Sequence, residues 1–130
     1  RSSPDFPTWA KRVGGHDFEM TWDVVFNWGD PVIGVHRTYS SSNIKKGVIW
    51  SNTQSYANKR VDELMEMAGS ETDPVKRKAL YSEFQKIVAE DVPVYHTYAL
   101  PYHTVYSDKV GNPPVGIWAT VSPLDRVYLK

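Results

Sequence analysis

The residues of this 130-residue chain best suited to chemistry lie in one short run, Phe26-Asn27-Trp28-Gly29-Asp30-Pro31. Aromatic rings offer flat apolar faces on which a ligand can stack, and a nearby carboxylate can anchor a polar group. Arg37 follows in the next loop, where its planar guanidinium can pair with a ligand carboxylate through two parallel hydrogen bonds. We therefore predict a ligand-binding corner composed of Phe26, Asn27, Trp28, Asp30 and Arg37.

Residues of this corner also have a purely structural interpretation. An aspartate before a proline commonly caps a turn by accepting backbone N–H bonds, so Asp30 can act without touching a ligand. Trp28 follows a predicted strand at the edge of a loop, which favours a place on a cleft wall, whereas Trp22 within that strand is expected in the core. An exposed arginine such as Arg37 commonly has no specific partner.

Sequence patterns typical of enzymes and metal sites are missing. There is no Gly-x-Ser-x-Gly elbow, no His-Glu-x-x-His pair and no glycine-rich phosphate loop. The carboxylate pairs Asp62-Glu63 and Glu90-Asp91 fall on predicted helices, where we expect them in solvent. His96 and His103 have neither cysteines nor clustered carboxylates beside them, which is too small a ligand set for a transition metal. We expect no enzymatic activity, no cofactor and no metal.

The composition is that of an ordinary folded domain. Hydrophobic residues make up 41% of the chain and charged residues 23%, and fifteen basic and fifteen acidic residues leave a net charge of zero. A neutral chain has no electrostatic bias toward nucleic acid, which we therefore do not expect as a partner. No apolar run approaches the length of a membrane span. The absence of cysteine rules out disulfides and thiolate metal sites.

Two amphipathic patterns predict a helical hairpin between residues 56 and 93. The first pattern, Val61 to Ala68, has apolar residues at i, i+3, i+4 and i+7 behind Asn58 as N-cap. Gly69 is expected to close this helix in the left-handed conformation. Asp73-Pro74 begins the second helix, because proline suits the first helical position. Its buried face is predicted to comprise Leu80, Tyr81, Phe84, Ile87 and Val88.

Alternation of apolar and polar residues predicts strands on both sides of the hairpin. The longest covers His16 to Trp28, and three shorter ones cover Val94 to Ala99, Tyr102 to Ser107 and Arg126 to Leu129. Before them, Pro7 to Val13 predicts a short helix ending at Gly14-Gly15. Residues 29 to 55 are rich in turn formers and predict a long surface segment, with short ordered pieces at His36 to Tyr39 and Val48 to Trp50.

The order of the hairpin residues resembles a known family. The string is Tyr56-x-Asn58-x-x-Val61-Asp62-x-Leu64, then Asp73-Pro74-x-Lys76-Arg77-x-x-Leu80-Tyr81-x-x-x-Gln85-x-x-Val88-x-Glu90-Asp91-x-Pro93. It is similar to the C-terminal region of the family 5 solute-binding proteins, the peptide, nickel and opine receptors of bacterial ABC importers. Further similar pieces, in family order, are Asp17-Phe18-Glu19-Met20, Trp28-Gly29-Asp30-Pro31 and Val110-Gly111 through Pro114-x-Gly116.

This resemblance implies an α/β fold, namely part of a periplasmic-binding-protein type II lobe in which a strand and the helical hairpin pack on a small mixed sheet. Residues 1–99 would belong to the C-terminal lobe, and residues 100–130 would return to lobe I. Because family members are much longer and bind ligand between two lobes, we expect a C-terminal fragment that supplies one cleft wall. Its partners would be the N-terminal remainder of the receptor and an ABC permease. The location would be periplasmic or extracellular, with or without a membrane anchor.

The resemblance also implies that the corner at residues 26–31 holds the ligand. In peptide-binding relatives an aspartate three residues before the Asp-Pro pair holds the peptide's α-ammonium, and here that position is Asn27. A neutral amide cannot form this charge-assisted pair, which is roughly twice as strong as a neutral hydrogen bond. The expected ligand is a peptide-like or related small solute, such as an opine, a modified peptide, a nickel complex or an oligosaccharide. A freestanding carbohydrate-binding module and a small hydrolase remain the alternative functions.

Overall fold

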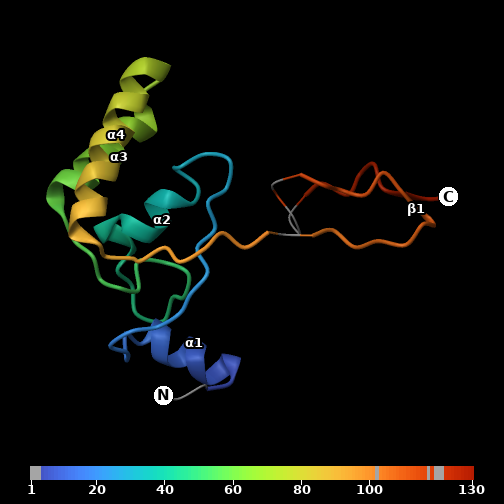
Figure 1. Ribbon diagram of the computed structural model, residues 1–130, viewed down its shortest axis with the longest axis horizontal. Helices are drawn as coiled ribbons and strands as arrows, with labels where there is room; N and C mark the ends of the chain where they lie inside the picture. Colours follow the sequence, from blue (N-terminus) through green and yellow to red (C-terminus); the bar gives the residue numbers. More distant parts are fainter. Residues whose placement is uncertain (1–3, 102, 117, 119–121) are drawn as a thin grey trace. The chain divides into compact units, whose positions relative to one another are not determined.

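The computed structural model describes residues 4–101, 103–116, 118 and 122–130. The chain divides into two compact units, Arg1–Tyr95 and His96–Lys130. In the described residues, the first unit contains four α-helices and one short 3-10 helix, and the second contains a two-stranded sheet (Figure 1). The expected α/β lobe with a mixed sheet is therefore corrected to a mostly helical unit followed by a small antiparallel ladder.

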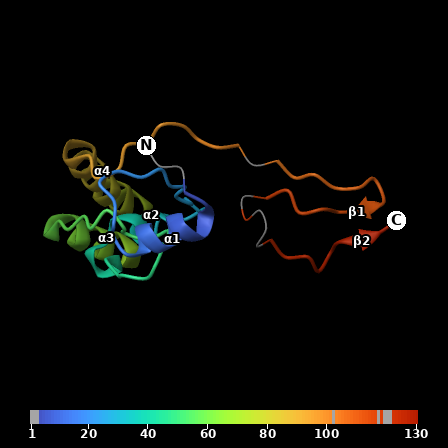
Figure 2. The ribbon, with the colours of Figure 1, turned by 90° about the horizontal axis from the view of Figure 1, so that it is seen from below.

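The strands of the second unit are much shorter than those predicted from the alternating apolar and polar residues. Strand β1 (Val110–Gly111) pairs antiparallel with β2 (Tyr128–Leu129), and Figure 2 shows the two strands beside each other. Val110 lies opposite Leu129, and Gly111 lies opposite Tyr128. Only the last two residues of the predicted strand at 126–129 are thus confirmed. The predicted strand at 94–99 is irregular, and so is the described part of the one at 102–107, whose first residue lies outside the described ranges.

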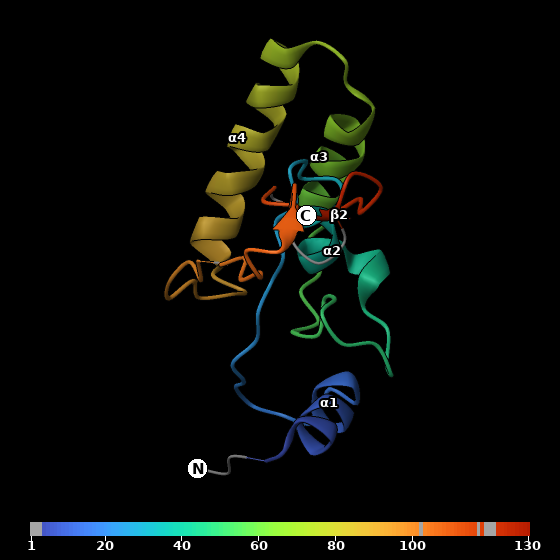
Figure 3. The same ribbon diagram turned by 90° about the vertical axis from the view of Figure 1, so that its right-hand side faces the viewer.

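The predicted helical hairpin is present as α3 (Lys59–Ser70) and α4 (Pro74–Asp91), which run side by side (Figure 3). Asn58 caps α3, because its side-chain oxygen accepts hydrogen bonds from the N–H groups of Arg60 and Val61. Asp73 caps α4 in the same way, and Pro74 occupies the first turn, where a missing N–H leaves no intrahelical bond unmade. Both predicted helix starts are confirmed.

The end of α3 differs from its prediction. The helix continues through Gly69 to Ser70, and the following Glu71 has φ −77° and donates its N–H to Met67. Among the described glycines only Gly47 has a positive φ, at 85°. The left-handed ending predicted at Gly69 is therefore wrong, because the helix closes one residue later without a left-handed residue.

The hydrophobic core lies where α3 and α4 meet the short helix α2 (Val35–Tyr39). Phe84 of α4 is 4% exposed, and its ring packs edge-on against Tyr39 of α2, with ring centroids 5.5 Å apart. Such edge-to-face pairs contribute roughly 0.5–1.5 kcal/mol of stabilisation beyond that gained by burying the rings. The remaining buried members of this cluster come from α3 and are Val61, Leu64 and Met65. The predicted inner faces of both hairpin helices are confirmed by this packing.

Helix α1 (Phe6–Gly14) matches the helix predicted from Pro7 to Val13. Asp5 caps its start by accepting the N–H of Thr8 at 3.0 Å, and Arg12 near its end pairs with Asp17 at 3.2 Å.

No helix in the described residues combines the length and the apolar content needed to cross a lipid bilayer.

The strand predicted from His16 to Trp28 is absent, and the segment is irregular. Met20 is 90% exposed and Trp22 is 69% exposed, so the expectation of a core position for Trp22 is also wrong. Alternating apolar and polar residues make a strand possible, but a strand is stable only when a neighbouring backbone pairs with it. Among the described residues, no ladder partner for this segment is present.

The long segment at residues 29–55 contains little regular structure and is held by hydrogen bonds from polar side chains. Its predicted piece at 36–39 is confirmed as α2, and a 3-10 turn, Ser41–Asn43, follows. Asn52 is completely buried and donates to the carbonyls of Ser40 and Tyr56 at 2.9 and 2.7 Å. Gln54 likewise donates to the carbonyl of Thr38 at 2.7 Å. These bonds satisfy backbone groups that a buried loop would otherwise leave without partners.

Candidate ligand-binding site

A cavity of about 220 Å³ opens at the predicted corner of the first unit. It is lined by Val25, Phe26, Trp28, Gly34, Arg37, Thr38 and Trp50. Three of the five predicted ligand-binding residues, Phe26, Trp28 and Arg37, therefore meet at one cavity. Within the described ranges, Asn27 and Asp30 are not among its lining residues, although both are part of the same corner.

Two aromatic rings form one wall of this cavity. The rings of Phe26 and Trp28 are stacked, with centroids 5.4 Å apart and an angle of 10° between their planes. The turn that follows folds back so closely that a Cβ atom at Gly34 would lie 2.2 Å from the carbonyl oxygen of Phe26. Only glycine fits at this approach. Gly34 thus allows α2 to bring Arg37 next to the stacked rings.

Trp50 also lines the cavity and is missing from the predicted set. Its backbone has φ 54°, a left-handed conformation that is a genuine outlier for a bulky residue. The next three residues are buried, and Ser51 donates its hydroxyl to the carbonyl of Asn43 at 2.8 Å. The sequence signal for Trp50 is an aromatic side chain in a polar loop.

Arg37 supplies the positive charge at the cavity. Arg37 is exposed, while the neighbouring Thr38 is buried and its carbonyl accepts a hydrogen bond from Gln54. Among the described residues, the guanidinium of Arg37 takes part in no ion pair, in contrast to Arg12, Arg60 and Arg77. Its five N–H donors are available to a carboxylate, which a guanidinium binds in a bidentate geometry.

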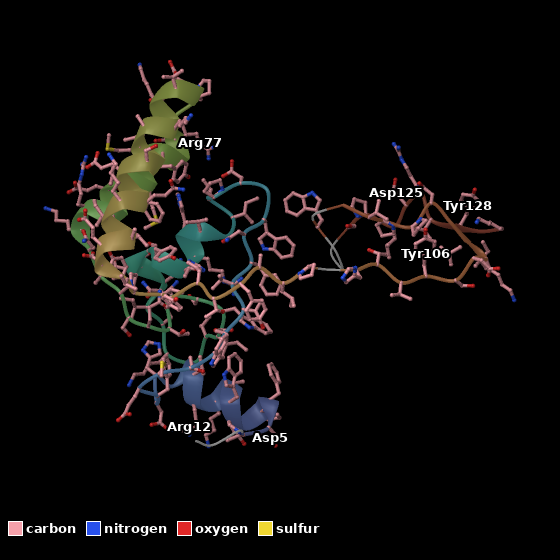
Figure 4. The ribbon with its side chains drawn as sticks, in the orientation of Figure 1. Asp5, Arg12, Arg77, Tyr106, Asp125 and Tyr128 are labelled. Atoms are coloured by element: carbon pink, nitrogen blue, oxygen red, sulfur yellow. The ribbon has the colours of Figure 1, made fainter. Side chains whose placement is uncertain are left out.

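Asp30 connects the corner to α4. Its carboxylate accepts the N–H of Val32 at 2.9 Å and pairs with Arg77 at 2.9 Å. The hydrogen bond from Arg77 is the main cause of a lowered pKa at Asp30. Arg77, labelled on α4 in Figure 4, also donates to the carbonyl of Ala68 at 3.0 Å and lies over the ring of Tyr81. In this geometry Asp30 is a turn cap and an anchor of the corner.

His36 extends this polar arrangement behind the cavity. Its Nε2 atom lies 2.9 Å from the hydroxyl of Tyr81. Burial lowers the pKa of His36, the positive charge of Arg77 lowers it further, and the negative charge of Asp30 opposes both. The contacts among Asp30, His36, Arg77 and Tyr81 therefore connect the corner and α2 to α4.

The two carboxylate pairs do not conform to the prediction that they are only solvated. Asp62 accepts hydrogen bonds from both the backbone N–H and the hydroxyl of Ser41. Asp91 accepts from the hydroxyl of Tyr56 and from the side-chain amide of Asn58. One carboxylate of each pair therefore has a structural role, because it ties a loop to a helix.

Two other kinds of site were considered besides the corner cavity: a metal site and a groove along α4. In the part of the chain that the structure describes, no group of three or more histidine, cysteine, aspartate or glutamate side chains could hold a metal ion. A larger groove of about 340 Å³ lies along α4, lined by Pro31, Val35, Lys78, Tyr81, Ser82, Phe84 and Gln85. Its lining includes the core residue Phe84 and the partly buried Val35 and Tyr81, which pack against the core. The corner cavity is distinguished by stacked rings beside the Arg37 guanidinium, for which the described ranges contain no ion-pair partner.

Comparison with known proteins gives one distant similarity. The chain is 28% identical over 124 residues, 93% of its length, to the probable deoxycholate-binding periplasmic protein YgiS of Escherichia coli (strain K12). The chain spans about a fifth of that protein, since the matched part is 20% of its length. No known protein family matches the chain. No solved structure matches it.

These findings correct the family resemblance drawn from the motifs. No family match supports the peptide, nickel and opine receptors, and the detected relative is named for deoxycholate. The structure provides a reason for the error: Asn58 and Asp73 cap helices, and Asp30 and Asp91 bind neighbouring loops and helices. Residues that cap helices or anchor turns have local structural roles, and the same roles occur in unrelated folds. What the comparison supports is a distant similarity to a probable periplasmic binding protein.

Proposed function

We propose that this chain is part of a periplasmic binding protein that captures an amphipathic small molecule bearing a carboxylate. The observation that carries the proposal is the corner cavity, where the stacked rings of Phe26 and Trp28 lie with Trp50 around the guanidinium of Arg37. The rings offer apolar faces to the body of the ligand. Arg37 pairs with its carboxylate, since it has no ion-pair partner of its own among the described residues.

The similarity to a protein named for deoxycholate agrees with this ligand chemistry. Deoxycholate combines a carboxylate with an apolar ring system, so it is the first ligand to test. A ligand held by its α-ammonium is less well suited, because Asn27 offers a neutral amide where a cation needs a carboxylate. In this proposal Asn27 donates or accepts a hydrogen bond at the rim, and Asp30 positions the corner through Arg77.

The cavity alone holds only part of such a ligand. Its volume of about 220 Å³ is below the roughly 300–1,000 Å³ of small-molecule sites. In this proposal the cavity is one wall of a cleft, and other parts of a longer protein supply the opposite wall. Transfer of the ligand to a membrane permease is then the step that follows capture.

The second unit supports the same conclusion. Val105 is 93% exposed, Leu129 is 82% exposed and Val115 is 77% exposed, and the ladder has two residues in each strand. An isolated two-stranded ladder is marginal in water. We propose that further chain covers this unit in the complete protein, as the assignment of residues 100–130 to a separate lobe requires.

Calorimetric titration of the complete protein with deoxycholate tests the proposal. The Arg37→Ala variant is expected to bind roughly ten- to a hundredfold more weakly, because a hydrogen-bonded charge is lost. Arg12→Ala is the matched control, since Arg12 is an exposed arginine on α1 that already pairs with Asp17. Failure of the protein to bind deoxycholate or any other apolar carboxylate would refute the proposal. Equal affinity of the Arg37→Ala variant would favour a neutral ligand such as an oligosaccharide.

A further inference from the structure

An aromatic surface continues from the cavity onto α1. The rings of Phe6 and Trp9 are stacked, with centroids 5.6 Å apart and an angle of 26° between their planes. The ring centroid of Phe6 also lies 6.3 Å from that of Trp50, which lines the cavity. Phe6, Trp9 and Trp50 therefore form a row of three neighbouring rings, here termed the aromatic row, that begins at the cavity wall.

The aromatic row is held in place by backbone and side-chain hydrogen bonds. Trp9 donates its indole N–H to the hydroxyl of Thr21 at 3.0 Å. The end of α1 is joined to the loop before Trp50, because Gly47 donates its N–H to the carbonyl of Gly14 at 2.7 Å. Trp50 has a left-handed backbone and is followed by three buried residues, Ser51, Asn52 and Thr53. A surface prepared in this way loses little conformational freedom when a ligand binds.

The row also exposes apolar area next to a cavity that is too small for a complete ligand. Phe6 is 59% exposed and Trp50 is 40% exposed. Strained, non-glycine backbone such as that of Trp50 concentrates at functional sites, where it positions a side chain. The exposed rings are thus suited to contact the part of a ligand that extends beyond the cavity.

We infer that Phe6 and Trp50 form a second subsite, which binds the far apolar end of an elongated carboxylate whose charged end lies at Arg37. This inference rests on the proposed function of the cavity. The subsite selects ligands by length, because a short carboxylate fills the cavity and ends before it reaches Phe6. A long alkyl chain or fused-ring body continues past Trp50 onto the exposed face of Phe6 and gains apolar contact there.

The test is a titration of the complete protein with straight-chain carboxylates of increasing length, kept below their micelle-forming concentrations. Each methylene group that becomes buried is expected to raise the affinity about fourfold. The Phe6→Ala variant is expected to bind long carboxylates about tenfold more weakly and short ones with unchanged affinity. Val75→Ala on α4 is the control, because Val75 is 76% exposed and far along the sequence from the cavity residues.

The affinity for short carboxylates also reports whether the Phe6→Ala variant is folded. Unchanged binding of long carboxylates in Phe6→Ala, combined with a loss in Arg37→Ala, overturns the second subsite and leaves the proposed function standing. An equal loss for short and long carboxylates also overturns it, because Phe6 would then act only by holding α1 in place. If Arg37→Ala binds every carboxylate as the wild type does, both the proposed function and this inference fail.

Discussion

Tyr56 donates its hydroxyl to Asp91, with 2.5 Å between the oxygens, and so joins the loop before α3 to the last residue of α4 across 35 positions of the chain. Asn58, the cap of α3, donates to the same carboxylate oxygen at 3.0 Å. Asp91 thus completes the base of the helical hairpin. A carboxylate at a helix C-terminus is unfavourable toward the helix dipole, and these two donors offset that effect.

The Tyr56–Asp91 pair predicts a dependence of stability on alkaline pH. Burial and the hydrogen bond to Asp91 raise the pKa of Tyr56 from 10.0 to about 12. Because the folded-state pKa is the higher one, the contribution is fully present below pH 10 and is lost as the pH rises through about 12. The Tyr56→Phe variant is expected to lose less stability over this interval than the wild type. Denaturant titrations of both proteins at stepped pH measure the difference, and identical pH profiles would contradict it.

Phe84→Ala should remove the centre of the core. Phe84 is 4% exposed and packs against Tyr39 and Tyr81. Truncating such a residue leaves a cavity, and the free energy of unfolding should fall by about 3 to 5 kcal/mol. Val75→Ala on the exposed side of α4 should change it by less than about 0.5 kcal/mol. A loss below about 1 kcal/mol in Phe84→Ala, measured by urea titration, would refute the assignment of the α4 face.

The Asp30–Arg77 pair predicts coupling between the corner and α4. Asp30→Asn and Arg77→Met should each lower the melting temperature, and the double variant should lower it by less than the sum of the two. The pKa of Asp30 is lowered from 3.8, mainly by the hydrogen bond from Arg77. Its contribution is therefore present above pH 3.8 and is lost as the pH falls through the lower folded-state value. Additive effects in a double-mutant cycle would show that the two side chains act independently.

Trp50 allows backbone strain to be separated from ligand contact. Trp50→Gly and Trp50→Ala both remove the indole, but only glycine accepts φ 54° without steric cost. The glycine variant should be more stable than the alanine variant by about 1 kcal/mol. Both should bind the ligand with similarly reduced affinity. Thermal unfolding and ligand titration of the two variants check this, and an alanine variant as stable as the glycine variant would mean that the left-handed backbone is not strained.

Part of the candidate site could be predicted from the sequence. Phe26, Trp28 and Arg37 were recognisable because stacking faces and a guanidinium near one another suit ligand binding, and they meet at one cavity. Trp50 was not among the predicted corner residues, because its neighbours in the sequence do not place its ring beside Phe26, Trp28 and Arg37. The aromatic row could not be predicted either, since Phe6 and Trp50 are far apart in the sequence and become neighbours only in the folded chain.

The helices were determined by the sequence itself, because a cap such as Asn58 or Asp73 and an apolar period of 3.6 act within one or two turns of the chain. The strands were not, since alternation between His16 and Trp28 specifies two faces but no backbone partner. Tertiary structure alone decided that Asp62 and Asp91 tie loops to helices and that Trp50 reaches the cavity. Hydrogen bonds and ring contacts between distant segments exist only after the chain has folded.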